Sequence, residues 1–464
     1  MGSYEAPPGW VVQAFEFALD PTPEQAAMLR RQFGGRRYAY NWAVRTLTAD
    51  LVAYRSTGME TEKPTLYGLR KRWNAVKSTE CTDTDTGEVW WPEVSKEAFA
   101  DGIRGAVDAY WNWQSSRSGN RAGRRVGFPW FKRKGRDRDR VTFTTGAIRV
   151  EADRRHVTVP RLGTLRVHEN TRRLQRLIAN DRARILAATV TRRGTRLMVA
   201  FRVAIARPIQ PRVRNPGSRV GVDVGVRVLA TIADDTGRVV ERVENPRPLA
   251  AALKELRHLG RQRSRRTQDS RRYAQTQARI TRLQSRVADI RAHHLHVLTT
   301  GLAKTHGNIV VEGLDAAGML QQKGLPGARA RRRGLSDAAL GEVRRQLAYK
   351  TTWYGSTLIV ADRWFPSSKT CHGCRHVQDI GWSEHWTCHG CGVRHQRDDN
   401  AAINLARYEA PTAGGVGVLS PVGAAVKRGA DRKTRPRRAG GDEARKNHLA
   451  PQSQVGQPRD GVPA

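Results

Sequence analysis

Apolar and polar residues alternate near the start of the chain and then give way to a helical period. The alternation covers 10–19, "WVVQAFEFAL", and predicts a strand. The sequence "TPEQ" (22–25) follows, with the residue types of a capping box and a proline at the first helical position. Beyond it the apolar residues take the spacing of a helix, so 27–120 is predicted to be mostly helical.

The helical pattern ends in a basic, aromatic turn. The segment 121–145 contains Gly127 and Pro129, and its aromatic residues lie among arginines and lysines. Such a mixture suits nucleic acid, because rings stack on bases while cations contact phosphates. It equally fits a basic turn whose rings pack beneath a sheet. Strand-like segments continue to about residue 205, and three prolines in 206–218 indicate a linker.

A second pattern of strands and helices begins after this linker. The segments "RVGVDVGVRVLATIA" (219–233) and "RVVERVE" (238–244) predict three consecutive strands of a meander. Residues 248–302 predict a helical hairpin, and 307–315 and 356–366 predict two buried strands. The fold class that follows is α/β combined with α+β.

The charge balance indicates a polyanionic partner. The 464 residues include 82 Lys and Arg against 43 Asp and Glu, which gives a formal net charge of +39 and a pI near 11.3. Such an excess destabilises a compact fold unless a polyanion binds, and nucleic acid would gain affinity through counterion release. A generally basic protein without such a partner is the alternative. The arginines of 248–302 either bind nucleic acid or form a solvated surface.

The chain shows no pattern typical of a membrane protein. The stretch "MGSYEAPP" (1–8) lacks the apolar core of a signal peptide, and no apolar run approaches the roughly eighteen residues of a membrane span. We therefore expect no membrane contact and a cytoplasmic location. After Tyr408 the composition changes to Gly, Pro, Ala, Arg and Lys, so 409–464 is predicted to be a disordered basic tail.

Four of the five cysteines are spaced as ligands of one metal ion. Cys371 and Cys374 form one Cys-x-x-Cys pair, and Cys388 and Cys391 form the second after thirteen intervening residues. Two hairpins that each present two thiolates close a tetrahedral site typical of structural zinc, with no open position for water. Clustered pairs and an odd count favour metal in a reducing compartment over disulfides, and Cys81 stands alone. Several nearby histidines could replace a thiolate: His372, His376, His385, His389 and His395.

Three acidic residues stand where strand or helix ends would place them. Asp223 lies in mid-strand in "VGVDVGV", Glu312 ends the strand "NIVVE", and Asp398 opens the helical run "DDNAAINLA". An acid among apolar strand residues is costly unless it is paired or binds metal, although each one alone also fits a turn or capping carboxylate. If the two strands are adjacent and parallel and a helix brings in the third acid, three carboxylates converge. Such a set would hold two Mg²⁺ ions for phosphodiester hydrolysis, with the zinc ribbon aiming Asp398.

These motifs, in this order, resemble the TnpB (OrfB) family of RNA-guided nucleases, which are encoded in insertion sequences and related to type V CRISPR effectors. The matching stretches are "FALDPTPEQ" (17–25), "GFPWFKRK" (127–134), "GVDVGVRVLAT" (221–231), "VVEGLD" (310–315), "LAYKTTWYG" (347–355), "FPSSKTCHGC" (365–374) and "HQRDDNAAINLA" (395–406). The resemblance spans 11–408, and the last four stretches together are highly specific.

The resemblance implies a site. The family's catalytic, magnesium-binding acids fall on Asp223, Glu312 and Asp398, and its zinc ligands fall on the four paired cysteines. The register counted back from Asn400 selects Asp398 over its neighbour Asp399, which would instead favour the helix dipole from solvent.

The resemblance also implies a bilobed architecture. An RNase H-like RuvC domain with an inserted zinc ribbon would follow a β-rich, wedge-like domain with a helical insertion. The implied parts are the wedge-like domain at 10–30 and 125–205, the helical recognition insertion at 31–124, the RuvC-like nuclease domain at 206–365 and 395–408, the zinc ribbon at 366–394 and the basic tail at 409–464.

The implied function is that of an RNA-guided DNA endonuclease of a transposable element. A guide RNA from the element's end would pair with double-stranded target DNA, the protein would be associated with the nucleoid, and the Mg-dependent RuvC site would cut. Two alternatives remain open: a miniature CRISPR effector nuclease, and a domesticated RNA-guided DNA-binding repressor without cleavage. Loss of a catalytic acid would favour the repressor, and none is lost here.

The chain departs from the family pattern at two positions. Gln396 stands where an acid is frequent, two residues before the catalytic position, and we expect it to do little harm. Arg375 stands where glycine is common in the first knuckle, and we expect it to alter a turn that glycine makes without strain.

Overall fold

The computed structural model describes residues 5–57, 64–121, 123–207, 213–321, 327–381 and 383–409. All of them belong to one compact unit, which spans Met1–Pro421. The predicted basic tail lies outside the described residues from residue 410 onward.

The N-terminal sheet has seven antiparallel strands in the order β2-β6-β7-β1-β5-β4-β3. They are β1 (Trp10–Asp20), β2 (Arg140–Phe143), β3 (Arg149–Val150), β4 (His156–Val159), β5 (Gly163–Val167), β6 (Ala183–Arg193) and β7 (Arg196–Ala206). The prediction of a strand at 10–19 is confirmed. The prediction missed α4 (Arg172–Ala179), although Leu174, Leu177 and Ile178 have the i, i+3, i+4 spacing of a helix face and pack on the core.

Helices interrupt this sheet between β1 and β2. They are α1 (Pro23–Thr57), α2 (Leu66–Glu80), a short 3-10 helix η1 (Trp91–Glu93) and α3 (Lys96–Arg117). The predicted capping box forms, because the Gln25 N–H bonds to Thr22 Oγ1 at 3.3 Å and the Thr22 N–H bonds to Gln25 Oε1 at 3.1 Å. α3 crosses α1 so closely that a Cβ on Gly102 would lie 2.3 Å from the Arg36 carbonyl oxygen. α1 runs unbroken through residue 30, the boundary that the resemblance implies between two parts.

The second sheet is mixed and has the order β10-β9-β8-β11-β12. Its strands are β8 (Asn215–Asp223), β9 (Val228–Asp234), β10 (Val239–Glu244), β11 (His306–Val311) and β12 (Thr357–Val360). The first three form the predicted meander, and β11 runs parallel to both β8 and β12. The predicted linker at 206–218 ends earlier than expected because β8 already begins at Asn215, while 208–212 lie outside the described residues.

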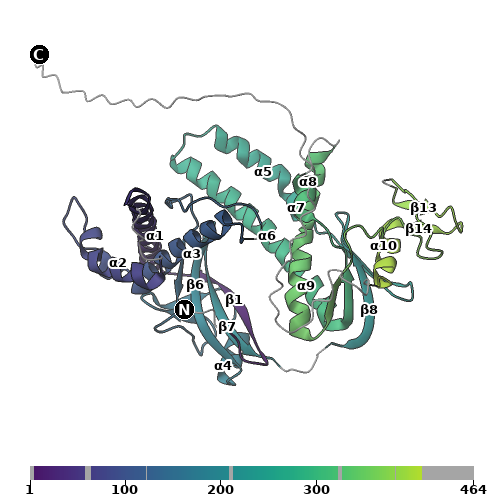
Figure 1. Ribbon diagram of the computed structural model, residues 1–464, viewed down its shortest axis with the longest axis horizontal. Coiled ribbons are helices and arrows are strands. Elements are labelled where there is room, and N and C mark those ends of the chain that lie inside the picture. The colour runs from purple at the N-terminus through teal and green to yellow at the C-terminus, as the bar shows by residue number, and fades with distance from the viewer. Residues whose placement is uncertain are drawn as a thin grey trace, which may run out of the picture. The chain divides into compact units, whose positions relative to one another are not determined.

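Helices cover both faces of the second sheet (Figure 1). The predicted hairpin is formed by α5 (Pro248–Ser264) and α6 (Arg271–Thr305). α6 and α9 (Leu340–Tyr354) pack on the face that presents Ile309 and Val311. The opposite face presents Val310, which packs with Leu405 of α10 (Arg397–Ala406). This alternation is the side-chain period of a strand buried on both sides, so the α/β part of the fold-class prediction is confirmed.

Three smaller groups of elements complete the described chain. α7 (Ala316–Gln321) and α8 (Ala328–Ala338) lie between β11 and α9 in sequence. β13 (His385–Thr387) and β14 (Arg394–Gln396) pair as a hairpin just before α10. Among the helices described here, none is long and apolar enough to cross a membrane.

Candidate active site and metal centre

Two of the predicted catalytic acids meet at one edge of the second sheet. β8 and β11 are adjacent and parallel, with Val222 and Val311 in register. The residues that follow, Asp223 and Glu312, therefore lie side by side at the carboxyl ends of the strands. Asp223 is the last residue of β8, so its predicted mid-strand position is wrong; the apolar residues after it form the connection to β9. This edge is where open α/β sheets bind their ligands.

Asp398 comes to the same edge because α10 lies directly on β8. The helix backbone passes so close to Gly221 that an added Cβ would lie 2.1 Å from the Ala402 carbonyl oxygen and 2.2 Å from the Ala406 amide nitrogen. Only glycine fits this crossing, which lies two residues before Asp223. Asp398 stands in the first turn of α10, and its charge acts on both strand acids.

Burial and mutual repulsion make the strand acids harder to ionise. Burial raises the pKa of Asp223 well above its ordinary value, and the charges of Glu312 and Asp398 raise it further. Burial also raises the pKa of Glu312, and Asp398 adds to that rise. The Arg397 guanidinium opposes both pKa shifts. A bound cation would stabilise the ionised form of such a set of acids.

Glu312 is held by a serine that the sequence analysis did not single out. Ser367 is 3% exposed, and its hydroxyl donates to Glu312 Oε1. Two buried amides of α10 hold the same loop: Asn404 Nδ2 donates to the Ser367 carbonyl at 2.8 Å, and Asn400 Nδ2 donates to the Thr370 carbonyl at 2.7 Å. The loop therefore ties Glu312 to α10. The i, i+4 spacing of the asparagines is the sequence signal that could have indicated a shared face.

Asp399 is engaged elsewhere. Its two carboxylate oxygens accept hydrogen bonds from Arg242 of β10, at 3.0 and 2.6 Å. The expectation that Asp399 faces solvent is wrong, since only 20% of its side chain is exposed and it forms this ion pair. Its N–H donates to Gln396 Oε1 at 2.7 Å, so Gln396 caps α10. The family departure at Gln396 thus leaves the helix start intact.

The four predicted zinc ligands form a compact cluster. The Sγ atoms of Cys371, Cys374, Cys388 and Cys391 lie within 4.8 Å of one another. Within the described ranges this is the group that could hold a metal ion as it stands, and no histidine belongs to it. Four thiolates are the donor set of structural zinc. His395 lies just outside the cluster, with Nε2 at 3.1 Å from Cys371 Sγ.

The departure at Arg375 has the backbone consequence that the sequence predicts. Arg375 adopts a φ of 65°, in the left-handed region. Glycine would take this conformation without strain, whereas an arginine there is uncommon. The knuckle nevertheless closes, because the Arg375 N–H donates to the Cys371 carbonyl at 2.9 Å.

The cysteine-bearing segment is fixed to both ends of α10. At the helix start the Arg397 N–H donates to the Glu384 carbonyl at 2.7 Å, and the Glu384 carboxylate pairs with Arg227 from the loop after β8. At the helix end Arg407 Nη1 donates to the His372 carbonyl at 3.0 Å. The metal centre and the helix of the third acid are thus mechanically joined.

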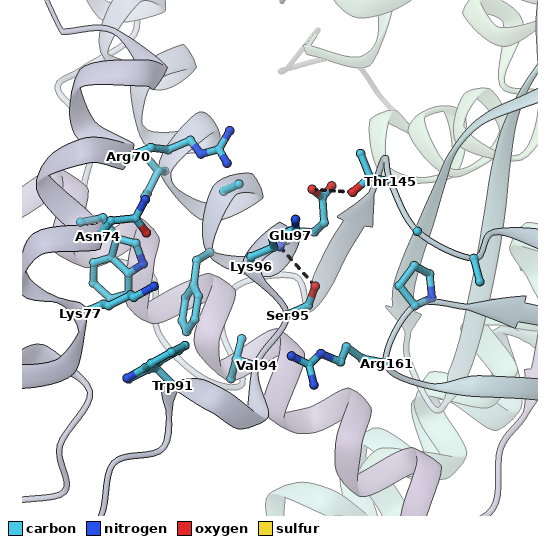
Figure 2. A pocket seen from close by; sticks show the side chains of 17 residues that line it. Arg70, Asn74, Lys77, Trp91, Val94, Ser95, Lys96, Glu97, Thr145 and Arg161 are labelled. Carbon is cyan, nitrogen blue, oxygen red and sulfur yellow. Dashed lines mark hydrogen bonds between the residues drawn. The ribbon is translucent and has the colours of Figure 1, made fainter.

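A hollow lies between α2, the start of α3 and the N-terminal sheet (Figure 2). Its volume is about 1010 Å³. Figure 2 shows Arg70 and Lys77 on one wall and Arg161 on the other. Its acid, Glu97, is engaged, because the Thr145 hydroxyl donates to it at 3.1 Å. The sequence analysis missed this basic hollow, since its cations come from segments far apart in the chain.

The aromatic rings of the turn at 121–145 lie in two environments, one packed on a helix and the other exposed to solvent. Phe128 packs edge-on against Trp113, with ring centroids 5.0 Å apart. Trp130 and Phe131 are 79% and 55% exposed. One ring therefore packs on α3, as a basic structural turn requires, while two remain available to solvent.

Three family models match separate parts of the chain. The OrfB/IS605 model described as "Probable transposase" matches residues 200–323, which contain Asp223 and Glu312. The model described as "Cas12f1-like, TNB domain" matches residues 341–405, which contain the four cysteines and Asp398. The OrfB/IS605 model described as "Helix-turn-helix domain" matches residues 11–50.

Related proteins extend the match over the whole chain. A Mycobacterium tuberculosis protein named "Putative RNA-guided DNA endonuclease" is 66% identical over 462 residues, 100% of this chain and 99% of the relative. The chain belongs to the OrfB (TnpB) family. A protein of Streptomyces pristinaespiralis with the same designation is 30% identical over 406 residues, 85% of this chain and 89% of the relative. The family resemblance drawn from the motifs is confirmed.

Solved structures give weaker likenesses to this OrfB-family chain. One, entitled "Cryo-EM structure of the Cas12f1-sgRNA-target DNA complex", has a TM-score of 0.30 at 14% identity and covers 85% of this chain and 99% of that chain. Another, entitled "Cryo-EM structure of CRISPR-Cas12f Ternary Complex", has a TM-score of 0.32 at 15% identity and covers 83% and 82%. TM-scores at this level do not establish a shared overall fold.

Proposed function

We propose that this OrfB-family protein is an RNA-guided DNA endonuclease of a transposable element. The observation that carries the proposal is the meeting of Asp223, Glu312 and Asp398 at one edge of the second sheet. The names of its relatives support an RNA-guided DNA endonuclease, and the net charge of +39 suits two polyanionic partners.

The three acids are the proposed magnesium ligands of an RNase H-like, RuvC-type site. Carboxylate oxygens are the preferred donors of this ion. Burial, and then the charges of Glu312 and Asp398, raise the pKa of Asp223, and a bound cation would offset both effects. Among the described residues only the four thiols are close enough to hold a metal ion as they stand, so the three acids would have to close on Mg²⁺ when it binds. When bound, Mg²⁺ would supply an activated water and stabilise the leaving oxygen of a phosphodiester. Asp223 and Glu312 present their carboxylates from adjacent strands, and Ser367 orients Glu312 by donating to Oε1.

Zinc is the proposed ion of the thiolate cluster, with a structural role. All four donors are cysteines, which leaves no open position for water. By this proposal the ribbon at 366–394 holds α10, while 206–365 and 395–408 form the nuclease domain. The wedge-like part at 10–30 and 125–205 and the helical insertion at 31–124 would serve binding.

Guide RNA and double-stranded target DNA are the proposed partners. The hollow of Figure 2 suits a nucleic-acid backbone because Arg70, Lys77 and Arg161 line it. The polar faces of α5 and α6 carry further arginines, including Arg279 and Arg282, beside a second, open hollow.

Sequencing the RNA that copurifies with the protein tests the guided part of the proposal. We expect one structured species with a variable 3′ end, derived from the end of an insertion element. RNA derived from a CRISPR array would support the miniature effector instead. Random RNA fragments would contradict the proposal that an RNA guides the protein.

Cleavage of a plasmid target tests the nuclease part. We expect the protein with its RNA and Mg²⁺ to cut a target that matches the guide and to leave a plasmid with mismatches to the guide intact. Tight, sequence-specific binding without any cut would support the repressor.

A further inference from the structure

A highly exposed tryptophan stands on the loop that follows β12. Trp364 is 80% exposed, and the Arg363 guanidinium lies over its ring at 5.1 Å from the centroid. Single exposed apolar residues are common on protein surfaces, so exposure alone assigns no role. The loop that carries Trp364 also contacts Glu312 and its neighbour Gly313, and these contacts relate the ring to the three-acid site.

On one side of Trp364 the loop packs against Gly313, and on the other side it is hydrogen-bonded to Glu312. Before it, the chain passes directly over Gly313, the residue after Glu312: an added Cβ there would lie 2.6 Å from the Ala361 carbonyl oxygen and 3.3 Å from the Arg363 amide nitrogen. After it, Ser367 donates its hydroxyl to Glu312 Oε1. In the sequence, Trp364 therefore lies between the residues that pack on Gly313 and the serine that is hydrogen-bonded to Glu312.

Local bonds fix the backbone beneath the ring. The Trp364 N–H donates to Asp362 Oδ1 at 2.8 Å, which forms a tight turn. Arg363 Nη2 lies 3.4 Å from Asp315 Oδ2, so its head is tethered to the loop after β11. These two contacts hold the backbone beneath the ring and the cation over it.

We propose that Trp364 and Arg363 form a stacking platform for an unpaired base of the DNA strand that enters the three-acid site. The proposal rests on the proposed function for the identity of the strand. Indole rings stack on any base, and an arginine beside the ring adds cation–π attraction and a contact for phosphate. Bases in a duplex are already stacked, so the platform selects single-stranded DNA next to the bond to be cut.

Binding of single-stranded DNA to a cleavage-dead protein tests the platform. The protein carries Asp398→Ala and its copurified RNA, and the probe is a fluorescent oligodeoxynucleotide without a match to the guide. We expect Trp364→Ala to raise the Kd about tenfold and Trp364→Phe to change it by no more than about twofold, because stacking needs an aromatic face. Val240→Ala is the control, since Val240 is an exposed apolar residue (47%) on β10, outside the parts proposed to bind nucleic acid, and it should leave the Kd unchanged.

A base analogue gives a direct signature of stacking. 2-Aminopurine in the oligodeoxynucleotide loses fluorescence when it stacks, so we expect quenching by the protein that retains Trp364 and none by the Trp364→Ala variant. Equal effects of Trp364→Ala and Val240→Ala, unchanged quenching in Trp364→Ala, or a loss confined to RNA affinity would overturn the platform. Because binding is measured without cleavage, these outcomes are independent of whether the wild-type protein cuts DNA.

Discussion

At the scale of single residues, the edge that carries the three acids includes a hydroxyl group that donates to one of them. Ser367 donates to Glu312 and is itself fixed by Asn404 of α10. Loss of one such bond to a charged group costs about 1.5–3 kcal/mol where the group stays buried. The serine therefore acts as a positioning residue for a proposed metal ligand.

Ser367→Ala should weaken metal binding more than it weakens DNA binding. We expect the Mg²⁺ concentration for half-maximal cleavage to rise about tenfold, which corresponds to about 1.4 kcal/mol. Mn²⁺ binding followed by electron paramagnetic resonance should weaken in parallel. Ser368→Ala, at the neighbouring and more exposed position, is the control, and equal behaviour of the two variants would contradict the role of Ser367.

Asp399 forms an ion pair whose contribution to stability we expect to be small. Its ion pair with Arg242 is partly exposed, so Arg242→Ala should lower the free energy of unfolding by only about 0.5–1 kcal/mol. The loss should shrink in high salt because exposed charges are screened. Chemical denaturation at low and high salt measures this change in the free energy of unfolding. A large loss that does not depend on salt would contradict a partly exposed ion pair.

The sequence predicted the thiol cluster because a tetrahedral metal site requires particular residue types at fixed spacing, and the structure brings the four thiols together. Asp223 and Glu312 stand out in the sequence because an acid beside apolar strand residues is costly, and Asp398 stands out because it opens a helical run. The catalytic role of the three acids stays a prediction. Ser367 and Arg242 could not be found, because their roles arise from partners 55 and 157 residues away in the chain.

At the scale of elements, the parallel pairing of β8 and β11 decides the geometry of the site. Alternation and turn signals indicated the strands, but the sequence offered their adjacency only as a condition. Gly221 explains how Asp398 reaches the two strand acids. The helix that carries it, α10, can approach β8 only over a residue without a side chain. Strand order and helix placement depend on such long-range contacts, which periodicity does not reveal.

The thiolate cluster should govern cleavage through α10. Cys388→Ser should release the metal ion, loosen the contacts at both ends of α10 and lower cleavage at least tenfold. Metal analysis should give about one zinc per wild-type chain. Cys81→Ala is the control, because Cys81 is buried far from the cluster in the N-terminal core. Unchanged cleavage in a variant shown to lack zinc would contradict this coupling.

The packing of α9 on α6 contains a buried lysine that makes stability depend on pH. Lys350 is 1% exposed, and its ammonium group donates to neutral oxygens, including Thr299 Oγ1 at 2.6 Å and Gln346 Oε1 at 3.0 Å. Burial lowers its pKa from 10.5 to about 8. Between these two values the unfolded chain binds more protons than the folded one, so this group makes the folded state more stable as pH rises.

Lys350→Met should remove that pH dependence. Relative to the variant, the wild-type protein should gain up to about 3 kcal/mol of unfolding free energy between pH 8 and pH 10.5. Denaturant unfolding at several pH values in this range gives the difference. A constant gap between the two proteins would show that the lysine titrates normally.

At the scale of the whole molecule, charge dominates behaviour. A net charge of +39 makes the free protein self-repelling, and a bound polyanion relieves that repulsion. RNA should therefore raise the melting temperature by mass action, and its affinity should fall steeply with salt. Thermal melts with and without RNA, and binding at two salt concentrations, measure both effects; a salt-independent affinity would contradict an electrostatic interface.

The central proposal for the whole molecule is that Asp223, Glu312 and Asp398 form the site that cuts DNA. The most direct measurement compares two neighbouring aspartates in plasmid cleavage with guide RNA and Mg²⁺, with target binding measured in parallel. Asp398→Ala should abolish cleavage and keep target binding, because a metal ligand is lost. Asp399→Ala should keep most of the activity, because its carboxylate is paired with Arg242 on β10. Normal cutting by Asp398→Ala, with or without loss of activity in Asp399→Ala, would contradict the proposed site.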